Sequence, residues 1–344
     1  MSWIVPFVAA SVPFPHFHHS SHFVRFKKEQ VLPTTRVAVI GAGFVGATTA
    51  YALLLSGLAA EIIIVDSDPQ KAEGEVMDLR HAVPLTHPTK IDVGTLADCA
   101  GATITVIAAG SGQRPGESRL NLVQRNVGIL RSIAPELGRI NPSGIIILAT
   151  NPVDILTFEA LSLCGLPANH VIGSGTILDT ARFRFLLSEH FRVDSRSVHA
   201  HIIGEHGDSE VPVWSLANIA GMSLKSFGAI NRIPYDATAL DVIFQQTRSA
   251  AYEIIKRKKA TYYAVAAGII RIIEAIVRDQ HTVLSVSSLI EDYYGMSGVC
   301  YSLPTIIGRD GVESVLRLEL DREEVTALKA SYGVLRETIE SIHL

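Results

Sequence analysis

A glycine-rich turn between two short apolar runs constrains the fold of this chain more than any other feature. The first run, Arg36–Ile40, has the length and composition of a strand buried on both faces. It leads into the turn Gly41–Gly46 (GAGFVG) and then into a helix-like stretch, Ala47–Ser56. A second apolar run, Glu61–Val65, ends in Asp66, 20 residues after the turn. This order of strand, glycine turn, helix, strand and acid is typical of dinucleotide-binding sites.

Each part of the pattern has a physical task. Gly41 permits a tight turn, Gly43 lets the backbone approach a pyrophosphate, and Gly46 lets the helix pack close to the sheet. The helix N-terminus presents N–H groups to the phosphates. Asp66 can accept hydrogen bonds from ribose hydroxyls and repels a 2′-phosphate, and Ser67 adds no cation, so NAD is favoured over NADP. The alternative is a glycine-rich turn that binds nothing.

The same alternation continues through the first half of the chain. Strand-like runs follow at Thr103–Ala109 and Gly144–Thr150, and apolar spacing predicts one helix over Leu120–Leu137 between them. Strands alternating with helices predict an α/β fold with a Rossmann-type doubly wound parallel sheet. Gly110 and Asn151 follow strand ends, where such sheets bind ligands, so the loops after them are candidate site loops.

The second half has a mixed pattern of helices and strands. The elements expected there are helices over Leu240–Lys258, Tyr263–Val277 and Arg322–Ser341 and strands over Thr282–Ser288 and Gly311–Leu320. We therefore expect an NAD-binding Rossmann domain over 35–173 and a C-terminal mixed α/β domain, which binds substrate and carries out catalysis, over 174–344.

Residues 1–34 differ in composition from the rest of the chain. Prolines interrupt the apolar start, four histidines follow it, and the first acid is Glu29. The cations come after the apolar stretch, whereas a secretory signal carries them before it. We expect a disordered or dispensable extension, with a targeting segment and an oligomer-contacting arm as alternatives.

Charge and cysteine content exclude several classes of protein. The formal net charge is −4, without the basic surplus of an electrostatic nucleic-acid binder. Three cysteines cannot form a disulfide framework and fit a reducing, cytoplasmic location. No apolar run approaches the roughly 18 residues that a membrane span requires.

Three polar segments carry groups that could do chemistry. The glycine-rich segment Ala109–Arg119 lies between a strand and a helix and has the composition of a mobile lid. Leu178–Arg182 holds a carboxylate and a guanidinium at a helix start, and Gly204–Ser209 holds a histidine between two glycines. Taken singly, these groups could equally be a helix N-terminal charge, a surface ion pair and a loop histidine.

Several longer stretches are chemically specific. They are GAGFVGATTAYAL from Gly41, VDSDPQKAEGEVMDL from Val65, SGQRPGESRLNLVQRN from Ser111, NPVDILT from Asn151, GSGTILDTARFR from Gly173, GEHGDSEVPVWS from Gly204 and ATYYA from Ala260. Together they resemble the L-lactate dehydrogenase family, within the wider lactate/malate dehydrogenase group. The resemblance runs from about Arg36 to the C-terminal helix.

The resemblance implies a role for each site residue. His206 donates and accepts the proton of the substrate oxygen, and Asp179 orients its imidazole. Arg182 binds the substrate carboxylate, and Arg119 polarises the carbonyl from the lid. The substrate-binding residues that it implies are Gln113, Arg119, Asn151, Asp179, Arg182 and Thr261. The cofactor-binding residues that it implies are Gly41, Gly43, Val45, Gly46, Asp66, Lys71, Gly110, Ser111, Ser132, Ala149, Thr150 and Asn151.

Elementary chemistry agrees with these residue types. Reducing a 2-oxo acid moves a hydride to C2 and a proton to the developing alkoxide, and histidine, with an ordinary pKa of about 6.5, titrates near neutrality. A nearby carboxylate raises that pKa. A planar carboxylate calls for a bidentate arginine, and a second cation stabilises the alkoxide once water is expelled.

Gln113 distinguishes between relatives. Malate dehydrogenases of similar pattern have arginine six residues before the lid arginine, where it pairs with the second carboxylate of oxaloacetate. A neutral amide leaves such a carboxylate uncompensated, and Glu117 adds a negative charge. We therefore predict reversible NADH-dependent reduction of pyruvate to (S)-lactate. Malate or another 2-hydroxy acid is the alternative, and a non-catalytic NAD-binding protein is the alternative from a different class.

The resemblance also bears on assembly and regulation. Family members are usually homotetramers, and bacterial members activated by fructose 1,6-bisphosphate use an arginine and a histidine at positions that match Arg184 and His199. Lys259 is a departure, because the family usually has glycine there for close approach beside the site. Tyr252 and Lys256 match the YxxxK pattern of short-chain dehydrogenases, which we interpret as coincidental helix surface.

Overall fold

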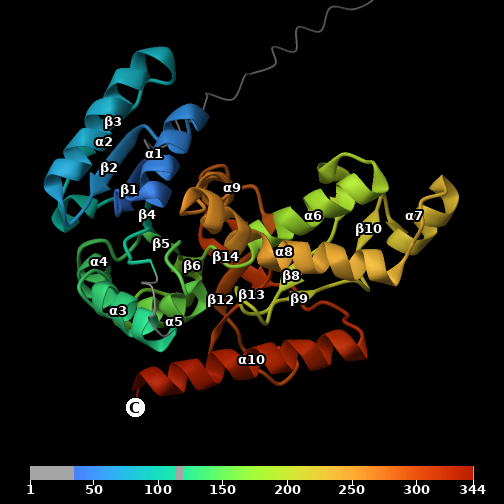
Figure 1. Ribbon diagram of the computed structural model, residues 1–344. Coiled ribbons are helices and arrows are strands. Elements are labelled where there is room, and N and C mark those ends of the chain that lie inside the picture. Colours follow the sequence, from blue (N-terminus) through green and yellow to red (C-terminus); the bar gives the residue numbers. More distant parts are fainter. Residues whose placement is uncertain (1–34, 113–118, 344) are drawn as a thin grey trace, which may run out of the picture. The chain divides into compact units, whose positions relative to one another are not determined.

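Short runs of branched aliphatic residues form the strands of a central sheet (Figure 1). The computed structural model describes residues 35–112 and 119–343. Within this part of the chain, nine strands pair in the order β14-β13-β12-β6-β5-β4-β1-β2-β3. Their bounds are β1 Arg36–Ile40, β2 Glu61–Val65, β3 Lys90–Val93, β4 Ile104–Ile107, β5 Ile145–Leu148, β6 Val171–Gly173, β12 Thr282–Leu289, β13 Cys300–Gly308 and β14 Gly311–Val315.

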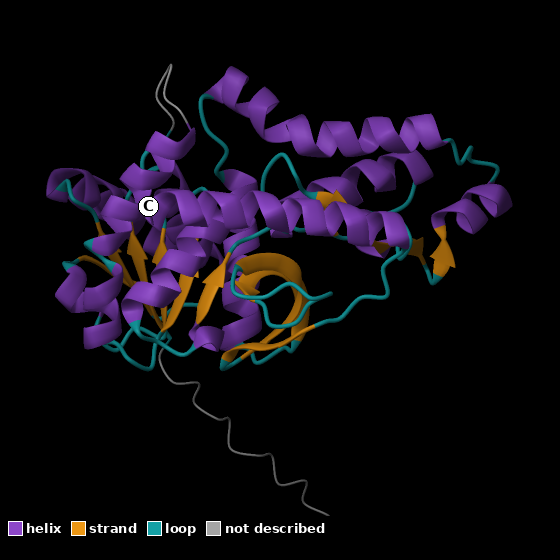
Figure 2. Ribbon diagram, turned by 90° about the horizontal axis from the view of Figure 1, so that it is seen from below, coloured by secondary structure: helices purple, strands orange, loops and turns teal. Residues whose placement is uncertain are grey.

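The strands β1 to β6 form the parallel, doubly wound sheet that the sequence predicts. Successive side chains of β1 point to opposite faces, as strand geometry requires. Val37 and Val39 pack with residues of α1, α2 and α9, whereas Ala38 and Ile40 pack with residues of α3, α4, α5 and α10. Figure 2 shows helices on both sides of these strands. The helices are α1 Phe44–Ser56, α2 Pro69–Ala82, α3 Arg119–Arg131, α4 Ala134–Ile140, α5 Val153–Cys164, α6 Ile177–Phe191, α7 Leu224–Asn231, α8 Ala237–Lys258, α9 Tyr263–Val277 and α10 Arg322–His343.

The sheet continues into the second half of the chain. Strand β12 pairs antiparallel with β6 through Ser287 and Gly173, and β13 and β14 extend the sheet further. Gly173 is therefore a strand residue inside the sheet, at the position where we expect the first domain to end. The sheet joins the two halves directly.

A further part of the second half packs around its own apolar cluster. Phe183 and Leu187 of α6 and Leu240 and Ile243 of α8 belong to it. Short strands complete this region, namely β7 Val198–His199, β8 Ile202–Ile203, β9 Val211–Pro212, β10 Asn218–Ile219 and β11 Met222–Ser223. No helix in the part of the chain that the structure describes is long and apolar enough to cross a membrane.

The structure differs from the expectations about individual elements in two places. The single helix expected over Leu120–Leu137 is two helices, α3 and α4, with Pro135 in the first turn of α4. Proline lacks an N–H and clashes with the carbonyl four residues earlier, here that of Arg131, where α3 ends. The second difference is strand β13, which was not expected and lies between β12 and β14 although Pro304 interrupts its pattern.

Candidate active site

The glycine turn has the backbone geometry that only glycine supplies at low cost. Gly41 has a φ of +102°, and its N–H donates to the Val65 carbonyl at 2.7 Å. A Cβ on Gly46 would lie 1.7 Å from the carbonyl oxygen of Gly41. A Cβ on Gly43 would meet nothing within 4 Å, and no side chain caps the N-terminus of α1 there. The turn therefore leaves open space in front of backbone N–H groups.

This open space is part of a cavity of about 870 Å³. The cavity lies beyond the carboxyl ends of β1, β2 and β4, where parallel sheets bind ligands. The predicted cofactor-binding residues that line it are Gly41, Gly43, Asp66, Lys71, Gly110, Ser111 and Ser132. The predicted ones outside its lining are Val45, Gly46, Ala149, Thr150 and Asn151. Size, location and free N–H groups fit a dinucleotide.

Asp66 also stabilises the turn itself. Its Oδ2 accepts a hydrogen bond from the Ala42 N–H at 2.6 Å, and its Oδ1 accepts one from the Asp68 N–H at 2.9 Å. The carboxylate thereby joins the end of β2 to the glycine turn while it borders the cavity.

A second group of site residues meets at the start of α6. Asp179 and Arg182 lie one helical turn apart, and Arg182 Nη1 donates to Asp179 Oδ1 at 2.8 Å. The loop after β8 brings His206 to the same carboxylate, with its Nδ1 2.5 Å from Asp179 Oδ2. Asp179 is buried, whereas the His206 side chain is 23% exposed. The structure thus brings together the three groups that the sequence predicts.

The electrostatics of this group keep His206 protonated. Burial by itself lowers the pKa of His206, but the charge and hydrogen bond of Asp179, followed by the charges of Asp154 and Glu210, raise it to about 9. Burial raises the pKa of Asp179, but the charges and hydrogen bonds of His206 and Arg182 lower it below its ordinary value. At neutral pH the site therefore contains an imidazolium, a carboxylate and a guanidinium.

Asp154 was missed in the sequence analysis. It lies in the first turn of α5 and is buried, and its Oδ2 accepts the His206 N–H at 2.7 Å while its Oδ1 accepts from Ser302 Oγ at 2.9 Å. It holds the His206 backbone against the carboxyl end of β5. A lone acid in the otherwise apolar stretch Val153–Leu156 was the available signal.

The other predicted substrate-binding residues lie on connecting segments. The Asn151 carbonyl accepts from Asn126 Nδ2 at 2.8 Å, and Asn126 Oδ1 accepts from the Ser111 N–H at 2.9 Å, so Asn126 links two loops at strand ends. Thr261 lies between α8 and α9. Arg119 begins α3, but its side chain is outside the described residues, as are Gln113 and the rest of the predicted lid over 113–118.

The backbone at Lys259 gives a different reason for the family's glycine at this position than the close approach to the site that we expected. It ends α8 with a φ of +75°, in the left-handed region that favours glycine, and it is exposed. Glycine suits this position because of the helix end rather than because of close approach to the site.

Only one of the two predicted effector residues lines a second cavity of about 470 Å³. Arg184 lines it together with Arg196 and Arg271, and Arg184 Nε donates to the Ala200 carbonyl at 2.8 Å. His199 is exposed on β7 and is not among the lining residues.

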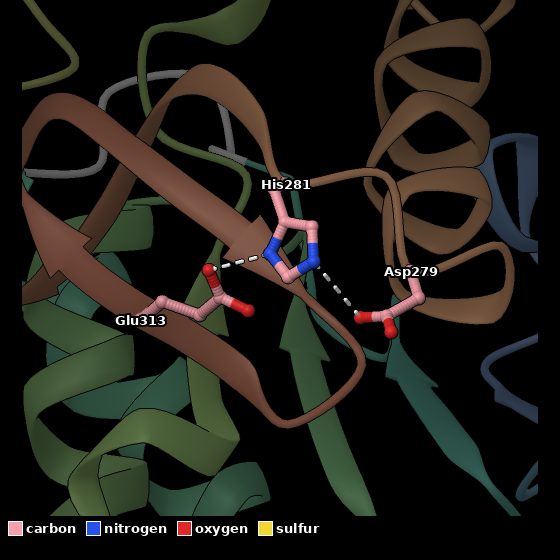
Figure 3. Close-up of side chains that lie close together, drawn as sticks. All are labelled: Asp279, His281 and Glu313. Atoms are coloured by element: carbon pink, nitrogen blue, oxygen red, sulfur yellow. Dashed lines mark hydrogen bonds and ion pairs between the residues drawn. The ribbon is translucent and has the colours of Figure 1, made fainter.

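A further cluster of titratable side chains joins the turn after α9 to β14 (Figure 3). His281 lies between two carboxylates, with its Nδ1 2.8 Å from Glu313 Oε2 and its Nε2 3.7 Å from Asp279 Oδ1. The Arg309 N–H donates to Asp279 Oδ1 at 2.9 Å. One ligand atom from each side chain lies within 4.8 Å of the others, and His281 forms an ion-pair bridge between the two carboxylates.

Comparisons with known proteins agree over nearly all of this region. A family model described as lactate/malate dehydrogenase, NAD binding domain, matches residues 35–173, and one described as lactate/malate dehydrogenase, alpha/beta C-terminal domain, matches residues 176–343. An L-lactate dehydrogenase of Acetivibrio thermocellus is 50% identical over 309 residues, covering 90% of this chain and 98% of the relative. A probable L-lactate dehydrogenase of Schizosaccharomyces pombe is 48% identical over 309 residues, covering 90% and 93%.

Solved structures of lactate dehydrogenases are also similar to this chain. A lactate dehydrogenase from a deep-sea metagenome library superimposes with a TM-score of 0.87 at 38% identity, covering 90% of this chain and 99% of that one. The minor L-lactate dehydrogenase of Enterococcus mundtii superimposes with a TM-score of 0.87 at 36% identity, covering 90% and 98%.

Proposed function

Since this chain belongs to the lactate/malate dehydrogenase family, we propose that it is an NAD-dependent L-lactate dehydrogenase that reversibly reduces pyruvate to (S)-lactate. The observation that carries the proposal is the contact of Asp179 with both His206 and Arg182. This arrangement supplies a proton donor and a cation for a carboxylate within one small group around a buried Asp179. Those are the two groups that reduction of a 2-oxo acid requires.

The cavity at the glycine turn fits NAD. Its open space faces the uncapped N-terminus of α1, which suits a pyrophosphate, and Asp66 at its edge suits ribose hydroxyls. The bound cofactor supplies or accepts the hydride, and the protein residues bind the substrate and transfer the proton.

His206 protonates the substrate oxygen in the direction of pyruvate reduction and removes the proton in the direction of lactate oxidation. Asp179 keeps the imidazole oriented and charged, as the raised pKa of His206 supports. Arg182 binds the substrate carboxylate. By resemblance, Arg119 polarises the carbonyl and Asn151 and Thr261 border the substrate.

Replacing His206 tests this assignment. The variant His206→Gln keeps a polar side chain but cannot carry the proton, so we expect turnover to fall by about 10²- to 10⁴-fold while NADH affinity stays nearly unchanged. Steady-state kinetics and NADH fluorescence titration measure the two quantities. Turnover close to that of the unmodified enzyme would refute the proton role.

Gln113 supports pyruvate over oxaloacetate as the substrate. An uncharged amide at that position leaves a second substrate carboxylate without a counter-charge, and desolvating it is then unfavourable. The methyl group of pyruvate has no such requirement.

We propose three finer features of the enzyme. By family resemblance it forms a homotetramer, and its free, buried cysteines suit the reducing cytoplasm.

Fructose 1,6-bisphosphate binds near Arg184 and His199, a proposal supported by the arginines around the second cavity. Adding this sugar bisphosphate should then lower the pyruvate KM and raise the melting temperature. If both stay unchanged, the effector site does not exist.

A further inference from the structure

Glu210 is a buried carboxyl group beside the catalytic histidine that the proposed reaction does not use. It follows the turn after His206 and immediately precedes β9, and it is 6% exposed. Its Oε1 is buried without a hydrogen-bond partner among the residues that the structure describes. Burying an ionised carboxylate in this way is strongly unfavourable, so the environment selects the neutral acid.

Four charged side chains, from two helices and one loop, act on Glu210. Asp179 and Arg182 act on it from α6, His206 from its own loop and Arg248 from α8. Arg248 is already engaged, because its Nη1 donates to the Asp208 carbonyl at 3.3 Å and its Nη2 to Gln245 Oε1 at 2.7 Å. Burial, followed by the Asp179 charge, raises the pKa of Glu210 to about 8, against the lowering effect of the three cations.

We propose that Glu210 is a positioning residue that carries a proton in the resting site and that, on losing it, weakens binding of the anionic substrate. A neutral Glu210 leaves Asp179 as the carboxylate that contacts both the imidazolium and Arg182. An ionised Glu210 adds a second negative charge close to where the substrate carboxylate and the developing alkoxide are bound. The inference rests on the proposed reduction of a 2-oxo acid at this site.

The substrate and Glu210 are thus coupled through charge. Binding of the 2-oxo acid anion holds the proton on Glu210, and loss of that proton raises the KM. The pKa of Glu210 is raised to about 8 and that of His206 to about 9, so both groups lose their protons above neutral pH.

The variant Glu210→Gln tests the coupling because glutamine resembles the protonated acid at every pH. The ratio of the pyruvate KM of the unmodified enzyme to that of the variant should rise roughly three- to tenfold between about pH 6.5 and pH 9. Glu319→Gln, at an exposed position before α10, is the matched control and should give a flat ratio. A Glu210→Gln ratio that does not change with pH overturns the coupling, since a merely structural role shifts KM equally at each pH.

Two measurements need no substrate and separate this inference from the proposed function. Infrared difference spectra between the unmodified protein and Glu210→Gln should show the C=O band of a protonated carboxylic acid that disappears as pH rises through about 8. As pH rises from about 5 to 8, the melting temperature of Glu210→Gln should increase relative to that of the unmodified protein. In this range the native unmodified protein holds a proton on Glu210 that the unfolded chain has released, so its stability falls with pH. If Glu210→Gln does not fold, infrared difference spectra of the unmodified protein between pH values replace this comparison, and the absence of a protonated-carboxyl band that titrates near pH 8 overturns the inference.

Discussion

Asp179 acts on both of its partners at the same time. One carboxylate oxygen contacts His206 Nδ1 and the other contacts Arg182 Nη1, so a single side chain positions the proposed proton donor and the proposed carboxylate-binding cation. Two positive partners compensate its burial and keep its pKa low. The charge on His206 therefore depends on Asp179.

Removing the Asp179 charge should shift the pH dependence of the reaction. In Asp179→Asn, burial lowers the pKa of His206 and only the smaller effects of the Asp154 and Glu210 charges oppose it, so the decline of kcat/KM for pyruvate with rising pH should move to lower pH. We expect kcat near pH 7 to fall by about 10²- to 10⁴-fold. The exposed Asp241 offers a control, since Asp241→Asn should leave the profile in place. An unshifted pH profile in Asp179→Asn would mean that another group sets the pKa of His206.

Helix α8 ends on a residue that its backbone geometry disfavours. Lys259 adopts a φ of +75°, which costs an L-residue about 1–2 kcal/mol relative to glycine. Its N–H donates to the Ile255 carbonyl at 2.8 Å, as in a left-handed helix end. Thr261 follows two residues later, so this helix end sets where the segment expected to border the substrate begins.

Lys259→Gly should stabilise the protein. We expect the free energy of unfolding to rise by about 0.5–1 kcal/mol, because relief of backbone strain exceeds the added flexibility of the unfolded chain. Urea unfolding measures the change. The same substitution inside the helix, Lys256→Gly, should instead cost about 1 kcal/mol. A destabilised Lys259→Gly would show that the lysine side chain contributes more than its backbone costs.

Sequence patterns predicted the bounds of helices and strands best where no proline interrupted an apolar run or a helical spacing. The residues of β1, β2 and α9 have the expected bounds because uniform apolar runs or a clear helical spacing mark them. Pro135 divides a helix whose apolar spacing continues across it, and Pro304 hides β13, which neighbouring strands stabilise from both sides.

The candidate site shows the same limit. Residue types and spacing predicted the glycine turn, Asp179, Arg182 and His206, because each belongs to a continuous motif. Asp154 and Glu210 lie in motifs too, but their roles depend on contacts and charges from other segments, which local spacing does not reveal.

The sheet explains how the two halves of the chain share one site. Because β12 pairs with β6, the second half is attached at the edge of the parallel sheet. Asp154 from the first half then fixes the backbone of His206 from the second. The cavity at the glycine turn and His206, the proposed proton donor, are thereby held by one continuous framework of strands and hydrogen bonds.

The assignment as an L-lactate dehydrogenase depends on which 2-oxo acid the enzyme prefers. Steady-state kinetics with NADH should give a kcat/KM for pyruvate that exceeds that for oxaloacetate by about a hundredfold, because Gln113 leaves the second carboxylate uncompensated. Gln113→Arg should narrow or reverse this preference. An unmodified enzyme that prefers oxaloacetate would contradict the assignment.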